Sequence, residues 1–81
     1  MIKVERTTFR VDGIDEQCII VSNDFAKVRI SKCYHYIGAD SLYLYEYLDG
    51  EYNSSEEWEG DYDLLTDADA VRLAKKFCVY L

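Results

Sequence analysis

The side chains that could do chemistry in this chain are mostly carboxylates, and they are concentrated in one segment. Residues 39–69 hold eleven Asp and Glu residues and no Lys or Arg. Paired carboxylates can act as general acids and bases, and clusters of them can bind calcium. Asp61, Asp63, Asp67 and Asp69 supply oxygen ligands, but they lack the alternating order, central glycine and closing glutamate of an EF-hand loop. We therefore expect no metal site in this segment.

Zinc chemistry and nucleophilic catalysis have little support elsewhere in the sequence. His35 is the only histidine and lies two residues after Cys33, so on a strand both side chains would point to the same side. A zinc site needs about four ligands, and these are two. The chain has no Ser/His/Asp arrangement, no glycine-rich phosphate loop and no HExxH motif. We expect no cofactor and no enzymatic activity.

Length, charge and cysteine usage restrict the class of protein. The chain has 81 residues and a net charge of −7, which leaves room for one domain, residues 1–81. Such a charge disfavours nucleic acid and anionic membranes as partners and favours basic ones. There is no apolar run of transmembrane length and no signal peptide, so we expect a cytoplasmic protein, in the host cytoplasm if a phage encodes it. We expect its cysteines, Cys18, Cys33 and Cys78, to be reduced and buried.

The excess negative charge comes from one segment of the chain. Residues 1–38 carry six bases and five acids, and residues 70–81 carry three bases and no acid. Only residues 39–69 are strongly acidic. Two interpretations stay open: a solvated surface that keeps a small protein soluble, or a surface directed at a basic partner.

Apolar periodicity predicts four strands. β-Branched and alternating apolar residues favour strands at about 2–11, 17–22, 25–36 and 41–48. The alternation in the first strand changes phase between Val4 and Phe9, which predicts a bulge near Arg6. The continuous apolar run from Cys18 to Val21 is typical of a strand covered on both faces. Asp12-Gly13 predicts a turn after the first strand.

An acidic segment and a helix complete the chain. Residues 49–65 show no strand pattern, and we expect a long acidic segment there, with one helical turn near residues 55–58. Thr66 is a natural N-cap, and Asp69 stands at the capping-box position three residues later. Apolar residues recur at helical spacing after Thr66, which predicts a helix over about 67–80.

These elements predict an α+β domain of order ββββα: a four-stranded antiparallel meander with one C-terminal helix packed on one face. A single helix can cover only one face of such a sheet. The other face must therefore meet solvent, a second copy of the chain or a partner.

Tyrosine alternation on the fourth strand indicates which face is left open. Seven of the eight tyrosines lie between Tyr34 and Tyr62. Tyr43, Tyr45 and Tyr47 share one side of the strand; Leu42, Leu44 and Leu48 share the other, with Glu46 among them. We expect the leucine side under the helix and the tyrosine side uncovered, where tyrosines often form interfaces. The alternatives are that the rings only stabilise the sheet across strands, or that the tyrosines lie inside.

The tyrosines and the acidic segment together predict a protein-binding surface. A rigid array of carboxylates can imitate the charge of DNA and occupy a basic cleft, while aromatic rings anchor the contact. The predicted partner-binding residues are Tyr43, Tyr45, Glu46, Tyr47, Asp49, Glu51, Glu56, Glu57, Trp58, Glu59, Asp61, Tyr62 and Asp63.

In size and charge the chain is similar to phage-encoded inhibitors of bacterial defence, such as anti-CRISPR proteins and anti-restriction DNA mimics, and to immunity proteins and antitoxins against basic nucleases. This likeness implies an inhibitor of a basic, nucleic-acid-handling protein. The alternative is a homo-oligomeric structural or adaptor module, for instance a homodimer, whose acids only keep the assembly soluble.

Overall fold

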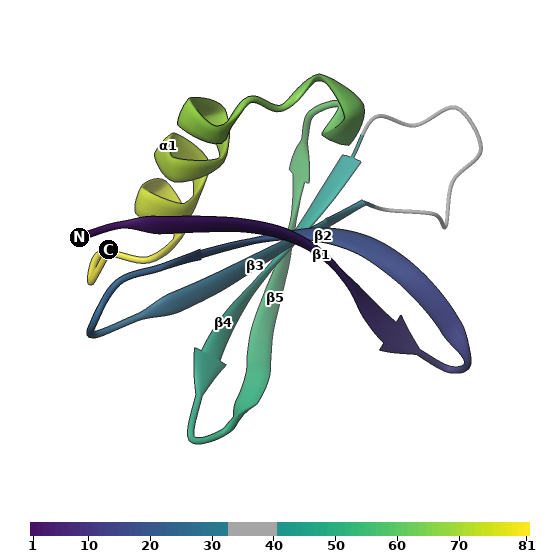
Figure 1. Cartoon of the computed structure of the whole chain (residues 1–81), viewed down its shortest axis with the longest axis horizontal. Coiled ribbons are helices and arrows are strands. Elements are labelled where there is room, and N and C mark those ends of the chain that lie inside the picture. The colour runs from purple at the N-terminus through teal and green to yellow at the C-terminus, as the bar shows by residue number, and fades with distance from the viewer. Residues whose placement is uncertain (33–40) are drawn as a thin grey trace.

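A five-stranded antiparallel sheet and one helix make up the part of the chain that the computed structural model describes, residues 1–32 and 41–81 (Figure 1). The strands pair in chain order, so the sheet is a meander. A short 3-10 helix, η1, links the sheet to the C-terminal helix, α1. The bounds are β1 (Lys3–Val11), β2 (Ile14–Ser22), β3 (Lys27–Lys32), β4 (Ser41–Leu48), β5 (Glu51–Glu59), η1 (Tyr62–Leu64) and α1 (Asp67–Phe77). The predicted α+β class, with an antiparallel sheet and one C-terminal helix, is confirmed.

The predicted number of strands is wrong, because β5 occupies most of the segment expected to be an acidic loop with one helical turn. Asp49 and Gly50 both have positive φ, 51° and 86°, and they form a two-residue turn that sends the chain back along β4. Asp12 and Gly13 do the same between β1 and β2, with φ of 50° and 82°. Asp-Gly is a favoured pair at such turns because Gly accepts positive φ without strain.

Several predicted boundaries also differ from the structure. β2 begins at Ile14 rather than at residue 17, because the tight turn lets pairing start at once. β3 begins at Lys27, and the end of the strand predicted over 25–36, together with Cys33 and His35, lies outside the described residues. α1 ends at Phe77 rather than near residue 80.

The predicted bulge in the first strand is wrong. β1 pairs with β2 without interruption from Lys3 to Val11. The phase change arises because Val4 packs against the core on one face, while Phe9 packs against aromatic rings on the other. The irregularity of the sheet lies instead between β4 and β5, at Leu44/Glu46.

Helix α1 covers one face of the sheet, lying against β1, β2 and β3 (Figure 1). Its start is fixed by the predicted capping box: the Asp69 amide donates to Thr66 Oγ1 at 3.1 Å, and the Thr66 amide donates to Asp69 Oδ2 at 3.1 Å. Small side chains on the inner face of the helix let it approach the sheet closely. The fully buried apolar core consists of Ile19, Val21, Val28, Ile30, Leu42, Leu44, Ala70 and Ala74, with Cys18 also fully buried. The leucine side of β4 is therefore the side under the helix.

Candidate functional site

The carboxylates of the predicted site line one edge of the sheet. β5 is the last strand in the sheet order, so its outer edge pairs with no other described strand. We call the carboxylates of β5 and of its two flanking turns the acidic edge. It consists of Asp49, Glu51, Glu56, Glu57, Glu59, Asp61 and Asp63, of which only Asp61 is partly buried. The structure thus brings these predicted residues together on consecutive elements.

Some of these carboxylates are held by local bonds. Ser41 Oγ donates to Glu57 at 3.2 Å, and Trp58 Nε1 donates to Glu56 at 3.3 Å. Asp61 caps η1 by accepting from the Asp63 amide, and Asp63 pairs with Lys32 at 2.9 Å. These contacts limit the freedom of the carboxylates, so the edge presents a partly fixed arrangement of negative charge.

Three other residues of the predicted site face the interior. Trp58 stacks edge-on against Phe77 of α1, with ring centroids 6.3 Å apart. Tyr62 is 8% exposed and belongs to the core. Glu46 is half-buried on the helix side of β4, where it accepts a weak hydrogen bond from Cys78 Sγ at 3.5 Å. These three side chains are therefore not available as part of an exposed surface in the way the sequence predicted.

No helix of the described residues lies over the tyrosine face, but this face is not flat. Phe9 on β1 and Tyr52 on β5 lie on opposite edge strands, yet their ring centroids are 5.6 Å apart. In a flat sheet, strand spacings of about 4.8 Å would put the two edges about 19 Å apart. The sheet therefore curls away from the helix and brings its two edges toward each other over this face.

Arg29 lies inside that curl and is the one buried base among the described residues, 4% exposed. It stands opposite Ile20 of β2 and Tyr45 of β4 in the register. Its guanidinium carbon lies 3.8, 4.2 and 4.8 Å from the ring centroids of Phe9, Tyr45 and Tyr52, respectively. We call Phe9, Arg29, Tyr45 and Tyr52 the arginine cluster. Cation–π contact of this kind stabilises a charge that water does not reach.

Burial at the arginine cluster changes the ionisation of its neighbours. Loss of water raises the pKa of the Tyr52 phenol above its usual 10.0, and the positive charge of Arg29 opposes this rise. The pKa of Cys18, a free and buried thiol, is likewise raised above 9.0 by burial, again against the effect of Arg29. Both groups therefore stay neutral at pH 7.

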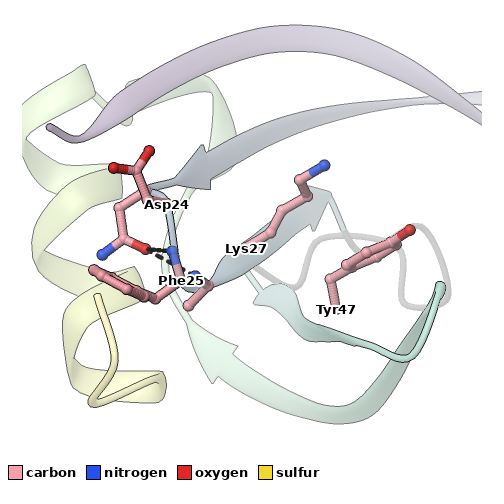
Figure 2. Close-up of a pocket in the computed structure, with 6 residues that line it drawn as sticks. Asp24, Phe25, Lys27 and Tyr47 are labelled. Carbon is pink, nitrogen blue, oxygen red and sulfur yellow. Dashed lines mark hydrogen bonds between the residues drawn. The ribbon is translucent and has the colours of Figure 1, made fainter.

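Tyr47 separates two hollows on this face. One is lined by Phe9, Arg29, Tyr47, Gly50, Glu51 and Tyr52. The other, shown in Figure 2, is lined by Asn23, Asp24, Phe25, Ala26, Lys27 and Tyr47. In the second hollow Asn23 Oδ1 accepts from the amides of Phe25 and Ala26, both at 2.8 Å, which fixes the turn before β3. Lys27 Nζ lies 4.9 Å from the Tyr47 ring centroid, so both hollows carry a cation beside an aromatic wall.

Sequence reasoning did not single out Arg29 as a site residue. The alternation of Val28 and Ile30 with Lys27 and Arg29 shows which side Arg29 takes. That Phe9 reaches it from β1 depends on the curl of the sheet, which no local pattern encodes.

Other kinds of site find no support in the described part of the chain. No group of three or more His, Cys, Asp or Glu side chains there is arranged to hold a metal ion. No helix among those residues has the length and apolar character needed to cross a membrane. No protein-family model, curated protein or solved structure matches the chain.

Proposed function

We propose that this protein binds a basic, nucleic-acid-handling protein through the acidic edge and thereby inhibits it. The observation that carries the proposal is the alignment of exposed carboxylates along an unpaired strand edge and the turn that follows it. A cleft that binds nucleic acid is positively charged, and opposite charge speeds association and selects the partner.

The spacing of the acidic edge supports imitation of a nucleic-acid strand. A β-strand rises about 3.3 Å per residue, and one strand of duplex DNA carries a charge about every 3.4 Å along the axis. Side chains alternate between the two faces of a strand, so Glu57 and Glu59 project to one face about 6.6 Å apart, which is close to two phosphate spacings, and Glu56 projects to the other face. From the outer edge of β5 a partner can reach side chains of both faces.

The narrower identity, a phage-encoded anti-CRISPR protein or anti-restriction DNA mimic, rests on size and charge alone and is part of the same proposal. An exposed edge strand also needs charges to prevent pairing with other chains. This protective role alone would account for the acidic residues of β5, with no partner that binds them. The two explanations differ in whether the position of the charges, rather than their number, determines binding.

The homo-oligomeric alternative has a weaker basis in the fold. A self-interface across the tyrosine face needs an open surface, but the curl of the sheet buries Arg29 there and leaves Tyr45 and Tyr52 half-buried. Tyr47, 38% exposed, is the large residue of β4 on this face that a second copy could contact.

A charge-reversal pair tests the proposal. The edge variant carries Glu51→Lys, Glu57→Lys and Glu59→Lys. The control carries Glu5→Lys, Asp15→Lys and Asp24→Lys, which lie on β1, β2 and the turn before β3. Each variant changes three acids into bases and so raises the net charge from −7 to −1. The six substituted positions are exposed, so the melting temperatures should stay close to that of the natural chain.

Tagged natural protein is used to capture partners from a bacterial lysate at low salt, and bound proteins are released by a salt step and identified. We expect a basic nucleic-acid-binding protein that elutes between roughly 0.2 and 0.5 M salt and loses DNA or RNA binding when the natural chain is added. The edge variant should fail to bind it and the control should keep binding. Equal loss in both variants would show that net charge alone acts, and capture of no such protein with a dimeric bait would favour the oligomeric module.

A further inference from the structure

Arg29 has an unmet requirement for hydrogen bonds. Its Nε and Nη1 atoms are buried and have no hydrogen-bond partner in the structure. A guanidinium stays charged at any physiological pH, so Arg29 does not become neutral and its buried N–H groups remain donors of a charged group. Ring faces stabilise its charge but do not accept in-plane hydrogen bonds, and an unsatisfied buried donor on a charged group is destabilising.

An open hollow lies beside Arg29. Nε and Nη1 are closed off from solvent in this structure, so an acceptor in the hollow reaches them only when a ring of the arginine cluster moves aside. The hollow has a volume of about 410 Å³, within the range of small-molecule pockets. Phe9, Tyr47 and Tyr52 line it together with Arg29. Gly50, at the tip of the β4–β5 turn, adds no side chain to the opening.

We propose that this cavity binds a small organic monocarboxylate with a flat apolar body, whose carboxylate accepts from the Arg29 guanidinium and whose body lies against Phe9, Tyr47 and Tyr52. A planar carboxylate matches the planar array of guanidinium donors, and the rings provide apolar contact for the remainder. This site does not depend on the proposed partner of the acidic edge.

Charge selects a monoanion over a phosphate group. The protein as a whole carries −7, and Glu51 lines the same cavity. Attraction to Arg29 and repulsion from the acids both scale with the charge of the ligand, but the cost of removing an anion from water rises with the square of its charge, so a phosphate with nearly two negative charges is disfavoured against a carboxylate. The neighbouring Lys27 is paired with the Tyr47 ring in the other hollow and does not line this cavity.

The probe is sodium benzoate, with benzamide as a neutral compound of the same shape and inorganic phosphate as the competing anion, all at constant ionic strength. Binding is followed through the Arg29 Nε–Hε resonance and through the melting temperature. We expect benzoate to shift the resonance saturably and raise the melting temperature, benzamide to do neither, and phosphate to bind more weakly than benzoate. Equal effects of benzoate and benzamide, or tighter binding of phosphate, would overturn the assignment.

Arg29→Met keeps an apolar stem of similar length in the ring cluster and removes the donors. Its matched control is Lys75→Met, which removes one positive charge from the exposed surface of α1. Benzoate binding should weaken at least about tenfold in Arg29→Met and stay unchanged in Lys75→Met. If Arg29→Met fails to fold, Tyr47→Ala, which opens the cavity wall, should weaken binding instead. Retained benzoate affinity in the variant that folds would overturn the proposal.

Discussion

The two faces of the sheet are buried in different ways. On one face α1 packs apolar side chains against Ile30 and Leu44, which are fully buried. On the other face the part of the chain that the structure describes has no helix, and the sheet covers itself by curling until Phe9 of β1 meets Tyr52 of β5. The first face is filled with apolar groups, Tyr62 and Trp58 among them, and the second is built around a cation held among rings.

We expect the helix-covered face to contribute mainly to stability and the curled face to be the one that can bind a ligand. On the helix-covered face close-packed apolar side chains fill the space, and no described polar side chain buried there lacks a hydrogen-bond partner. The curled face keeps unsatisfied donors on Arg29 beside a cavity. Functional groups are expected where a local requirement of packing or hydrogen bonding is left unmet, and Arg29 on the curled face is such a place.

The largest expected effect comes from breaking the helix-covered face. Leu44→Ala leaves a cavity under α1 and should lower the free energy of unfolding by about 2–5 kcal/mol in a urea titration. Arg29→Met on the other face should change it by less than about 1 kcal/mol, because it replaces a buried charge with an apolar chain. A larger loss in Arg29→Met than in Leu44→Ala would show that the arginine cluster is the main source of stability.

A smaller effect is expected at Gly60, which joins β5 to η1. Its φ is +155°, and a Cβ there would lie 2.9 Å from Leu42 Cδ1 in the core. Gly60→Ala should therefore lower the free energy of unfolding by about 1–3 kcal/mol through overpacking of the helix-covered face. Gly13→Ala, where no atom lies within 4 Å of the added Cβ, is the control for backbone strain alone. Equal losses in both would mean that contact with Leu42 has no effect.

The smallest effect concerns pH and the curled face. The pKa of Tyr52 is raised above 10.0 in the fold, so the folded chain holds this proton more tightly than the unfolded chain. Its contribution to stability is complete below pH 10 and is lost as pH rises through the folded pKa. Tyr52→Phe should therefore lose less stability than the natural chain above pH 10, measured by urea unfolding across that range. Cys18 is present in both proteins, so its own raised pKa cancels in the comparison. Parallel curves would show that Tyr52 is not desolvated.

Local signals in the sequence predicted much of the fold. Thr66 and Asp69 marked the helix start, because a capping box needs only neighbouring residues. Alternation in residues 41–48 separated the leucine side from the tyrosine side, and the helix covers the leucine side. The fifth strand was missed although Asp49-Gly50 repeats the Asp12-Gly13 turn signal, because Glu51–Glu59 is too acidic to show the apolar alternation of a strand.

For the candidate sites too, some features followed from the sequence and others only from the tertiary structure. The sequence by itself determined that the negative charge is concentrated in one segment, because contiguous residues on a strand and its turn must stay close in space. It could not show that Trp58 and Tyr62 turn inward. Only the tertiary structure decided that Arg29 is buried among Phe9 and Tyr52, because those residues are far apart in the chain and meet through the curl of the whole sheet. That curvature is a property of all five strands together and not of any one of them.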